Sequence, residues 1–347
     1  MSPASVPKVQ LNDGTSVPIL GLGTYEAPKG ETKRVVALAL KAGYRHLDCA
    51  DFYENEDEVG EAIEEAIAGG LLTRDQLFVT TKVWPNWYAP GRPTTSIKRS
   101  LSRLRLAYVD LALVHWPTPL KQDDGNFYPT DESGQALFDY SITLLDVWKE
   151  FEAIKAAGKQ QQISNLKLSK SILTVVFTSS TTTGLAKSIG VSNFNSAQIQ
   201  DLIDHSGTVP SMNQVESHPF LGQQKLLAWC RSKGIALTAY SPLARTGTAE
   251  KKNTSSPLEN EVVRAIANAH SVSPAQVCIR WQVQRGVVVI PKSATPARIQ
   301  ANFDVFSFAL TEAEMAAMEG LNANWRNNTW SQFGINKHKD WPFAIEF

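Results

Sequence analysis

Short runs of β-prone residues alternate with longer amphipathic stretches along most of this chain. The first predicted element is a hairpin, because residues 9–11 and 17–20 flank Asn12-Asp13-Gly14, a turn sequence that suits positive φ. Eight β-prone runs are predicted to be strands: residues 19–22, 45–48, 78–82, 109–115, 187–191, 211–215, 236–240 and 287–290. The amphipathic stretches are predicted to be helices: residues 32–42, 57–68, 95–106, 142–157, 196–205, 223–233, 260–269 and 274–285.

Strands that alternate with helices of this length indicate right-handed βαβ units and a parallel sheet. Eight such units without a break in composition predict an α/β protein with a single (β/α)8 TIM barrel, preceded by the hairpin and followed by a long C-terminal loop or tail. A doubly wound open sheet is the alternative. Because no Pro-, Gly- or Ser-rich linker divides the chain, residues 1–347 are predicted to form one domain.

One segment, at about residues 160–185, departs from this alternation. It follows the predicted helix at 142–157 and ends in an uncharged stretch rich in hydroxyl groups. Helix-to-strand connections in α/β units usually take about 2–6 residues. The simpler interpretation is an atypical insertion that is packed as an extra strand or helix. Our hypothesis is that the segment is a translated intron or another gene-model artefact.

Composition narrows the classes of function. The 347 residues include 34 Lys+Arg and 34 Asp+Glu, so the formal net charge is zero, which argues against a nucleic-acid or anionic-membrane partner. The apolar runs are too short to span a bilayer, and no secretory signal is recognised. Three scattered cysteines fit a reducing compartment. We expect a cytoplasmic protein, as a monomer, with a small molecule as its partner.

Candidate catalytic groups lie where three successive predicted strands end. Asp48, Lys82 and His115 occupy these ends, and Tyr53 follows in the loop after Asp48. Catalysis in barrels is built at the C-terminal ends of strands. A phenol has an unperturbed pKa of about 10, and a nearby lysine held by a carboxylate is expected to lower it. This set of groups therefore indicates proton transfer to a carbonyl, with a neutral His115 orienting the oxygen.

The motifs around these positions resemble those of the aldo-keto reductases: Gly43-Tyr44-Arg45-His46-Leu47-Asp48-Cys49-Ala50, Val114-His115-Trp116-Pro117, Gly190-Val191-Ser192-Asn193-Phe194 and Ile290-Pro291-Lys292-Ser293. Within the family, Asn324-Trp325-Arg326 and the C-terminal tail are similar to the aldose/aldehyde reductases. The resemblance implies that Tyr53 is the proton donor, that Lys82 and Asp48 tune it, and that His115 orients the substrate. It implies NADPH-dependent reduction of aldehydes, including aldoses and small or aromatic aldehydes, to primary alcohols or alditols.

A cofactor is required because no side chain can supply a hydride. Lys292, Ser293 and Arg298 follow the eighth strand at the start of a short helix, and with the resemblance they imply a site for the 2′-phosphate of NADPH. The resemblance assigns further cofactor contacts: Gly23, Thr24, Ser192, Asn193, Gln214, Tyr240, Ser241, Leu243 and Asn302. Of these, Ser192, Asn193 and Gln214 match the groups that hold the nicotinamide carboxamide, and the ring of Tyr240 matches the one that stacks on the nicotinamide.

Aromatic side chains on the loops of the barrel rim indicate an apolar substrate pocket. Its predicted members are Tyr25, Trp84, Trp116, Tyr128 and Trp330. The histidines show no metal-ligand spacing, so no metal site is predicted. Two alternatives remain for the function. The same chemistry can run as a polyol or glycerol dehydrogenase, or the chain can be a non-catalytic regulatory or structural homologue.

Overall fold

Eight parallel strands form one continuous sheet in the computed structural model, which describes residues 6–27, 30–168, 184–244 and 256–345. Each strand pairs with the next one along the chain. In order, the strands are β3 (Leu22–Gly23), β4 (His46–Asp48), β5 (Phe78–Val83), β6 (Val109–Val114), β7 (Ala186–Ser192), β8 (Met212–Glu216), β9 (Ala236–Tyr240) and β10 (Val288–Val289). Both faces of a strand are covered in such a sheet, so β5 and β6 are buried along their whole length.

The sheet closes on itself between its first and last strands. Leu20 forms a parallel bridge with Val289, whose amide donates to the carbonyl of Ile19 at 2.8 Å. Only glycine fits at position 23 without a shift of the backbone, because a Cβ would lie 2.9 Å from the carbonyl oxygen of Ile290. The predicted (β/α)8 barrel is thus confirmed, and the doubly wound alternative is wrong.

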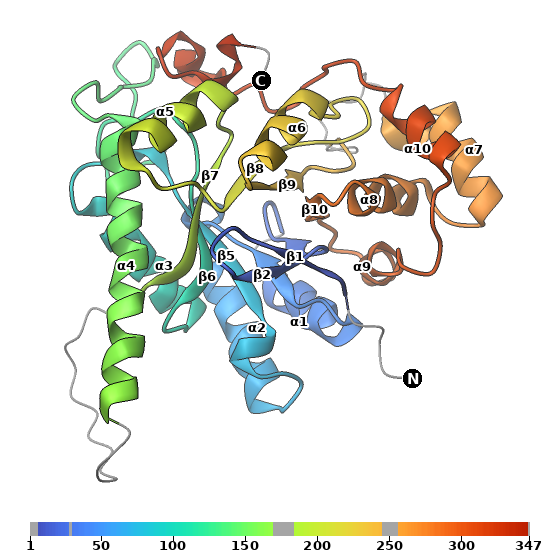
Figure 1. Ribbon diagram of the computed structural model, residues 1–347, viewed down its shortest axis with the longest axis horizontal. Coiled ribbons are helices and arrows are strands. Elements are labelled where there is room, and N and C mark those ends of the chain that lie inside the picture. Colours follow the sequence, from blue (N-terminus) through green and yellow to red (C-terminus); the bar gives the residue numbers. More distant parts are fainter. Residues whose placement is uncertain (1–5, 28–29, 169–183, 245–255, 346–347) are drawn as a thin grey trace.

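Helices surround the barrel on its outer side (Figure 1). They are α1 (Thr32–Ala42), α2 (Glu56–Ala68), α3 (Arg92–Leu104), α4 (Leu144–Leu168), α5 (Ser196–Ser206), α6 (Gln224–Ser232), α7 (Glu261–His270), α8 (Pro274–Gln284), α9 (Pro296–Phe303) and α10 (Glu312–Glu319). α3 shows why these segments are helical, since Ile97, Leu101 and Leu104 repeat at helical spacing and are buried. Gly60 of α2 allows close contact with α3, because a Cβ would lie 2.2 Å from the carbonyl oxygen of Arg103.

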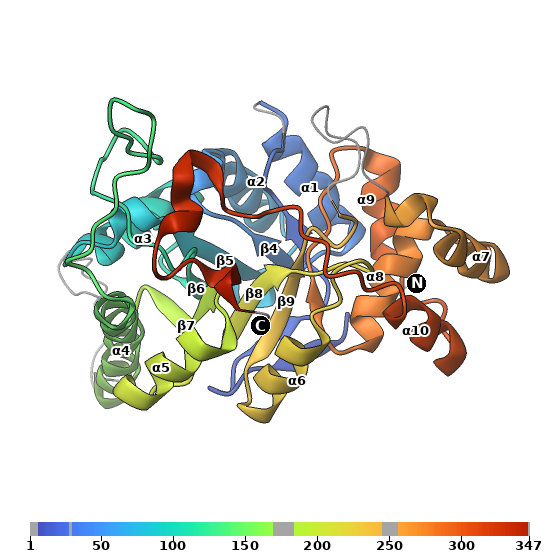
Figure 2. The same ribbon diagram turned by 90° about the horizontal axis from the view of Figure 1, so that it is seen from above.

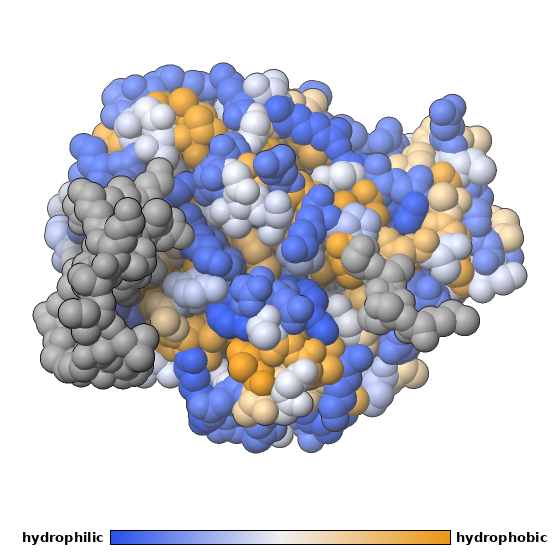
Figure 3. All heavy atoms as spheres, turned by 60° about the horizontal axis from the view of Figure 1, so that its bottom comes forward, coloured by the Kyte–Doolittle hydropathy of each residue, from blue (hydrophilic) through white to orange (hydrophobic). Residues whose placement is uncertain are grey.

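An antiparallel hairpin covers the N-terminal end of the barrel. Its strands are β1 (Lys8–Gln10) and β2 (Ser16–Pro18), as the turn sequence predicted. Leu11 and Val17 of the hairpin pack with Phe78, Leu111 and other barrel residues in one buried cluster. Figure 3 brings the underside of the molecule forward and shows polar and apolar residues interspersed on its surface. The hairpin therefore seals one end of the barrel and leaves the other end for chemistry.

The C-terminal segment crosses that other end. After α10 it runs over the mouth of the barrel in Figure 2, with 3₁₀ turns η6 (Gln332–Lys337) and η7 (Pro342–Ala344). Trp330 of this segment is 3% exposed and packs into the main core cluster. The predicted tail is thus an ordered wall above the strand ends. Within the described ranges, no helix combines the length and the hydropathy needed to cross a membrane.

Several predicted boundaries are wrong. The helix expected at 142–157 continues to Leu168, since Gly158 does not stop it and the glutamines that follow favour helix. The proposed insertion at 160–185 therefore begins inside α4; residues 169–183 lie outside the described part, so the hypotheses on its origin stay untested. The first strand is shifted to Leu22–Gly23, and α10 was not predicted.

Candidate active site

The ends of β4 and β5 hold a buried ion pair. The ammonium of Lys82 lies 2.5 Å from Oδ1 of Asp48, and the two side chains are 0% and 2% exposed. The same ammonium donates to the hydroxyl of Tyr53 at 2.9 Å and to the carbonyl of Cys49 at 3.0 Å. Since Tyr53 belongs to the short 3₁₀ turn η1 (Asp51–Tyr53) directly after β4, the local chain path returns its ring to the strand ends.

Asp48 is held from a second side. Nε2 of Gln214, on β8, donates to Oδ2 of Asp48 at 2.7 Å, and the hydroxyl of Thr24 donates to its backbone carbonyl at 2.8 Å. Both oxygens of the buried carboxylate are therefore hydrogen-bonded, which offsets much of the cost of removing it from water. Sequence reasoning placed Gln214 and Thr24 at a cofactor; in the structure the side chain of Gln214 bonds the carboxylate of Asp48, and the hydroxyl of Thr24 bonds the backbone carbonyl of the same residue.

The pKa of the Tyr53 phenol differs from the value expected from the sequence. Burial raises its pKa well above the usual value, and the negative charge of Asp48 acts in the same direction. The expected lowering by Lys82 is therefore wrong for the protein alone, because the charge of the lysine is already balanced by Asp48 and the phenolate has little access to water. Tyr53 is consequently protonated at neutral pH, which is the state that a proton donor needs.

His115 follows β6 and faces the same cavity. Burial, together with the positive charge of Lys82, lowers the pKa of His115 well below its ordinary value, so the imidazole is neutral, as the sequence predicted. Its ring centroid lies 6.0 Å from that of Tyr53 and 4.9 Å from that of Trp84. Its Nδ1 is buried without a hydrogen-bond partner. A neutral imidazole beside a phenol can position a polar oxygen without competing for the charge of Lys82.

A second set of polar residues lines the cavity, at or near the ends of β7, β8 and β9. Nδ2 of Asn193 donates to the hydroxyl of Ser192 and to the carbonyl of His115, each at 3.0 Å. The hydroxyl of Tyr240 donates to Oδ1 of Asn193 at 2.7 Å, and Ser192 donates to the backbone carbonyl of Gln214 at 2.8 Å. Asn193 has a left-handed φ of 62°, which an asparagine tolerates better than most residues. This connected set fixes amide and hydroxyl groups beside an aromatic ring.

One elongated cavity of about 410 Å³ joins these groups to the N-terminal end of α9. Lys292, Ser293 and Arg298 line its outer end, where Lys292 and Arg298 are exposed to solvent. Of the residues predicted from sequence, three do not line the cavity: Lys82, Thr24 and Asn302. Lys82 and Thr24 lie behind the wall and contact Asp48, whereas Asn302 is buried within α9. The loop beyond Ala244 lies outside the described residues.

All five predicted aromatic residues line the inner end of this cavity. The indole of Trp330 stacks on that of Trp116, with centroids 4.3 Å apart and planes 6° apart. Phe52 was not predicted, and it stacks on Trp84 at 3.7 Å. Other lining residues that the sequence analysis missed include Glu26, Asn328 and Gln332. Phe52 directly precedes Tyr53, so its position in the sequence could have indicated that it lines the cavity. Nothing in the sequence indicated this for the tail residues Asn328 and Gln332.

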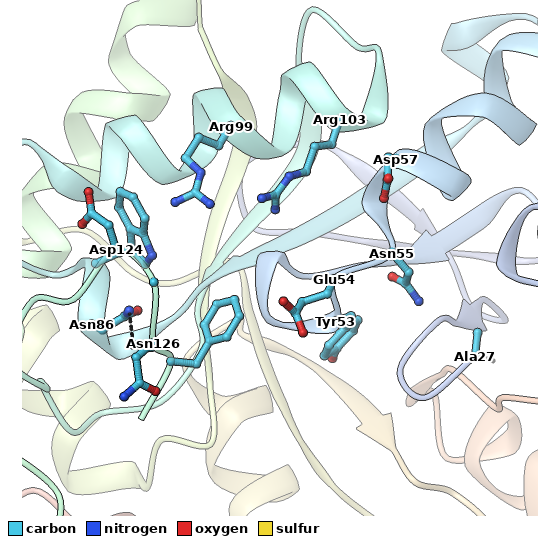
Figure 4. Close-up of a pocket in the computed structure, with 13 residues that line it drawn as sticks. Ala27, Tyr53, Glu54, Asn55, Asp57, Asn86, Arg99, Arg103, Asp124 and Asn126 are labelled. Atoms are coloured by element: carbon cyan, nitrogen blue, oxygen red, sulfur yellow. Dashed lines mark hydrogen bonds between the residues drawn. The ribbon is translucent and has the colours of Figure 1, made fainter. Parts of the chain in front are cut away.

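A second cavity, of about 450 Å³, lies on the other side of η1 and shares only Tyr53 with the first (Figure 4). Arg99 and Arg103 project into it from α3, and Glu54 and Asp57 also line it. Arg103 forms an ion pair with the fully buried carboxylate of Asp51, the first residue of η1. Charges of both signs therefore surround this cavity, and the Arg103 contact supports the turn that carries Tyr53.

The residues of the site indicate whether a dinucleotide or a metal ion could bind there. The cationic groups at a helix N-terminus at one end are of the type that holds a phosphate, and the amide, hydroxyl and aromatic groups at the other end suit a planar ring that carries an amide. Across the described ranges, no three His, Cys, Asp or Glu side chains are grouped so that they could hold a metal ion.

Comparisons with known proteins agree with this geometry. Residues 19–171 and 175–323 match the Aldo/keto reductase family. The chain is 41% identical to prostaglandin F synthase 1 of Bos taurus over 98% of both proteins, and 39% identical to aldo-keto reductase family 1 member A1 of Rattus norvegicus over 92% of this chain and 90% of that protein. It superposes on the aldose reductase of Schistosoma japonicum with a TM-score of 0.83 and 37% identity, over 98% of this chain and 100% of that one. The chain therefore belongs to the aldo/keto reductase family, whose members are oxidoreductases that act on carbonyl and alcohol groups.

Proposed function

We propose that this protein reduces aldehydes to primary alcohols or alditols with NADPH, and that Tyr53 donates the proton. The observation that carries the proposal is the hydrogen bond of 2.9 Å from Lys82 to the hydroxyl of Tyr53 at the floor of the cavity. A protonated phenol that already accepts a bond from an ammonium is suited to give up its proton when negative charge develops on a bound oxygen.

The residues present fit NADPH. Ser192, Asn193 and Gln214 would hold the carboxamide, because all three line the cavity and are linked by hydrogen bonds from Asn193 to the hydroxyl of Ser192 and from that hydroxyl to the backbone carbonyl of Gln214. Tyr240 presents a ring for stacking, and Lys292 and Arg298, at the other end, suit a phosphate. When bound, the reduced nicotinamide supplies the hydride.

Proton delivery depends on the residues of the chain itself. Tyr53 gives its proton to the carbonyl oxygen, and the ammonium of Lys82 stabilises the phenolate that remains. Asp48 keeps Lys82 in place through the buried ion pair. His115, neutral and facing the cavity, orients the carbonyl oxygen toward the phenol. Trp84, Trp116 and their neighbours exclude water from the reacting groups.

The apolar inner end favours small or aromatic aldehydes. Its walls are aromatic rings, and Trp84, Trp116 and Trp330 are each less than 8% exposed. One relative is a prostaglandin F synthase, so a bulkier carbonyl compound belongs in the substrate screen. Buried free thiols at Cys49, Cys230 and Cys278 support work in a reducing compartment such as the cytosol, and we propose a monomer there.

The test is oxidation of NADPH and of NADH with glyceraldehyde, xylose, glucuronate and an aromatic aldehyde, together with the reverse oxidation of a polyol. Tyr53→Phe should lower kcat by about 10²–10⁴-fold, the usual contribution of a general acid, with NADPH affinity unchanged. Tyr128→Phe is the matched control, because it removes another phenol from the same cavity and should retain activity. Wild-type protein inactive toward every carbonyl, or fully active Tyr53→Phe, contradicts the proposal.

A further inference from the structure

A buried carboxylate at the end of β8 holds the C-terminal segment by its backbone. Glu216 is 0% exposed, and its two oxygens accept from the amides of Asn327 and Asn328, each at 2.8 Å. Nε2 of His218 lies 3.1 Å from the same carboxylate. Two consecutive amides in a loop, each bound to one oxygen of a single carboxylate, define the path of the chain at that point.

We call this pair of hydrogen bonds, from the amides of Asn327 and Asn328 to the carboxylate of Glu216, the clamp. The carboxylate that forms it is ionised. Burial by itself raises the pKa of Glu216, but the hydrogen bond and charge of His218 and the two backbone amides outweigh burial, so that the pKa is lowered overall. A buried carboxylate is stable only when its oxygens are satisfied. The tail and the carboxylate therefore depend on each other, because without the amides of the tail the buried charge would lose two hydrogen bonds and keep that of His218.

The clamped amides lie next to the substrate wall. The side chain of Asn328 lines the catalytic cavity, and Trp330 lines it two residues later. Nε1 of Trp330 donates to the hydroxyl of Thr118 at 2.7 Å, and its ring stacks on Trp116. Trp330 has a left-handed φ of 52°, an unfavourable conformation for a bulky residue that persists only where the surroundings impose it.

We propose that Glu216 is a specificity-determining positioning residue: its carboxylate fixes the tail at Asn327 and Asn328 so that Trp330 completes the wall against which a bulky carbonyl substrate packs. Glu216 itself does not line the cavity and touches no reacting group. The kinetic half of this inference rests on the proposed function. The structural half, the clamp, does not.

Glu216→Gln is the closest isosteric test. A glutamine keeps one acceptor oxygen but presents an amide nitrogen, which donates, to the second backbone N–H. We expect kcat/KM for an aromatic aldehyde to fall by about tenfold relative to kcat/KM for glyceraldehyde, mainly through KM, because one hydrogen bond to a charged group is lost. Turnover of glyceraldehyde, which reaches Tyr53 without packing on Trp330, should stay within about twofold of wild type.

Hydrogen exchange supplies a readout that does not depend on activity. In wild-type protein the amides of Asn327 and Asn328 should be protected although they lie in a loop, and Glu216→Gln should speed the exchange of at least one of them by about tenfold. If Glu216→Gln does not fold, the wild-type measurement still decides the clamp, since fast exchange at both amides would overturn it.

Two further variants separate this proposal from a general loss of stability. Glu314→Gln is the matched control, because Glu314 also pairs with a histidine, His270 at 2.9 Å, but lies on α10 away from the cavity; it should leave the ratio of substrates unchanged. Trp330→Ala should reproduce the loss of selectivity, and adding Glu216→Gln to it should change the ratio less than twofold further. Equal losses for both aldehydes, or additive effects, would overturn the proposal. Inactive wild-type protein with protected amides would defeat the proposed function and leave the clamp standing.

Discussion

The two ends of the cavity that Tyr53 and His115 line are built differently. At the inner end, Asp48 and Lys82 are almost fully buried and are joined to Tyr53 and Gln214 by hydrogen bonds within the protein. At the outer end, Lys292 and Arg298 are exposed to solvent. The inner groups are held in position before any ligand arrives, and the exposed cations of the outer end are in contact with water and salt.

This difference indicates that the two ends have different functions. Groups that stabilise charge in a transition state act best when they are preorganised in a site with little water, which describes the inner end. Exposed cations gain less from each contact and are screened by salt, but they can select an anionic group on a cofactor. The inner end should therefore control the rate of reduction and the outer end the affinity for the cofactor.

The largest expected effect comes from Lys82→Met. This change leaves Asp48 buried without its cation, so we expect a loss of about 3–5 kcal/mol in the free energy of unfolding and a loss of kcat of at least about 10²-fold. Denaturant unfolding and steady-state kinetics measure both. Lys187→Met is the control, because Lys187 pairs with Asp110 while 47% exposed and should cost less than about 1 kcal/mol. Equal destabilisation by the two variants would refute the contrast.

A smaller effect is expected at the outer end. Lys292→Met should weaken binding of NADPH by about tenfold and leave the affinity for NADH unchanged, since only NADPH carries the 2′-phosphate. The loss should shrink as salt is raised. Fluorescence titration measures both affinities. Lys339→Met, another exposed lysine, serves as the control. A parallel loss of NADH affinity would show that Lys292 does not select the phosphate.

A third effect, on stability and not on catalysis or cofactor binding, is expected near η1. Burial raises the pKa of Glu56 to about 7, and this carboxyl accepts a hydrogen bond of 2.7 Å from Thr81, next to Lys82. Because the folded protein keeps a proton that the unfolded chain releases, stability should fall as pH rises from about 4.5 to about 7. Glu56→Gln removes this penalty and should stabilise the protein by up to about 3 kcal/mol above pH 7 and hardly at all at pH 4. Thermal unfolding of both proteins at the two pH values measures this, and a difference independent of pH would contradict it.

The fold was largely predictable because its elements are encoded locally. Runs of β-prone residues located the seven strands from β4 to β10, and Asn195 and Ser273 mark helix starts through capping boxes with Gln198 and Gln276. The errors arose where the pattern is weak. Helix α4 continues beyond Gly158 through residues without clear amphipathic spacing, and the first strand consists only of Leu22 and Gly23, which pair with β4 and are too few to show a pattern.

The site also contains features that could be predicted from the sequence and features that could not. That Asp48, Lys82 and His115 come together was predictable, because the strand ends of a barrel converge and a position in sequence therefore fixes a position in space. Neither the clamp of Glu216 on Asn327 and Asn328 nor the raised pKa of Tyr53 has such a signal. The first depends on a tail more than 100 residues away in sequence, and the second on how burial and two opposite charges balance.

The most direct test of the central claim measures kcat and the dissociation constant of NADPH in Tyr53→Phe and Arg298→Met side by side. If the inner end performs the chemistry and the outer end holds the cofactor, Tyr53→Phe loses kcat with its NADPH affinity intact. Arg298→Met then loses affinity with its kcat intact. Substantial turnover by Tyr53→Phe, or the same parameter changed in both variants, would contradict the account.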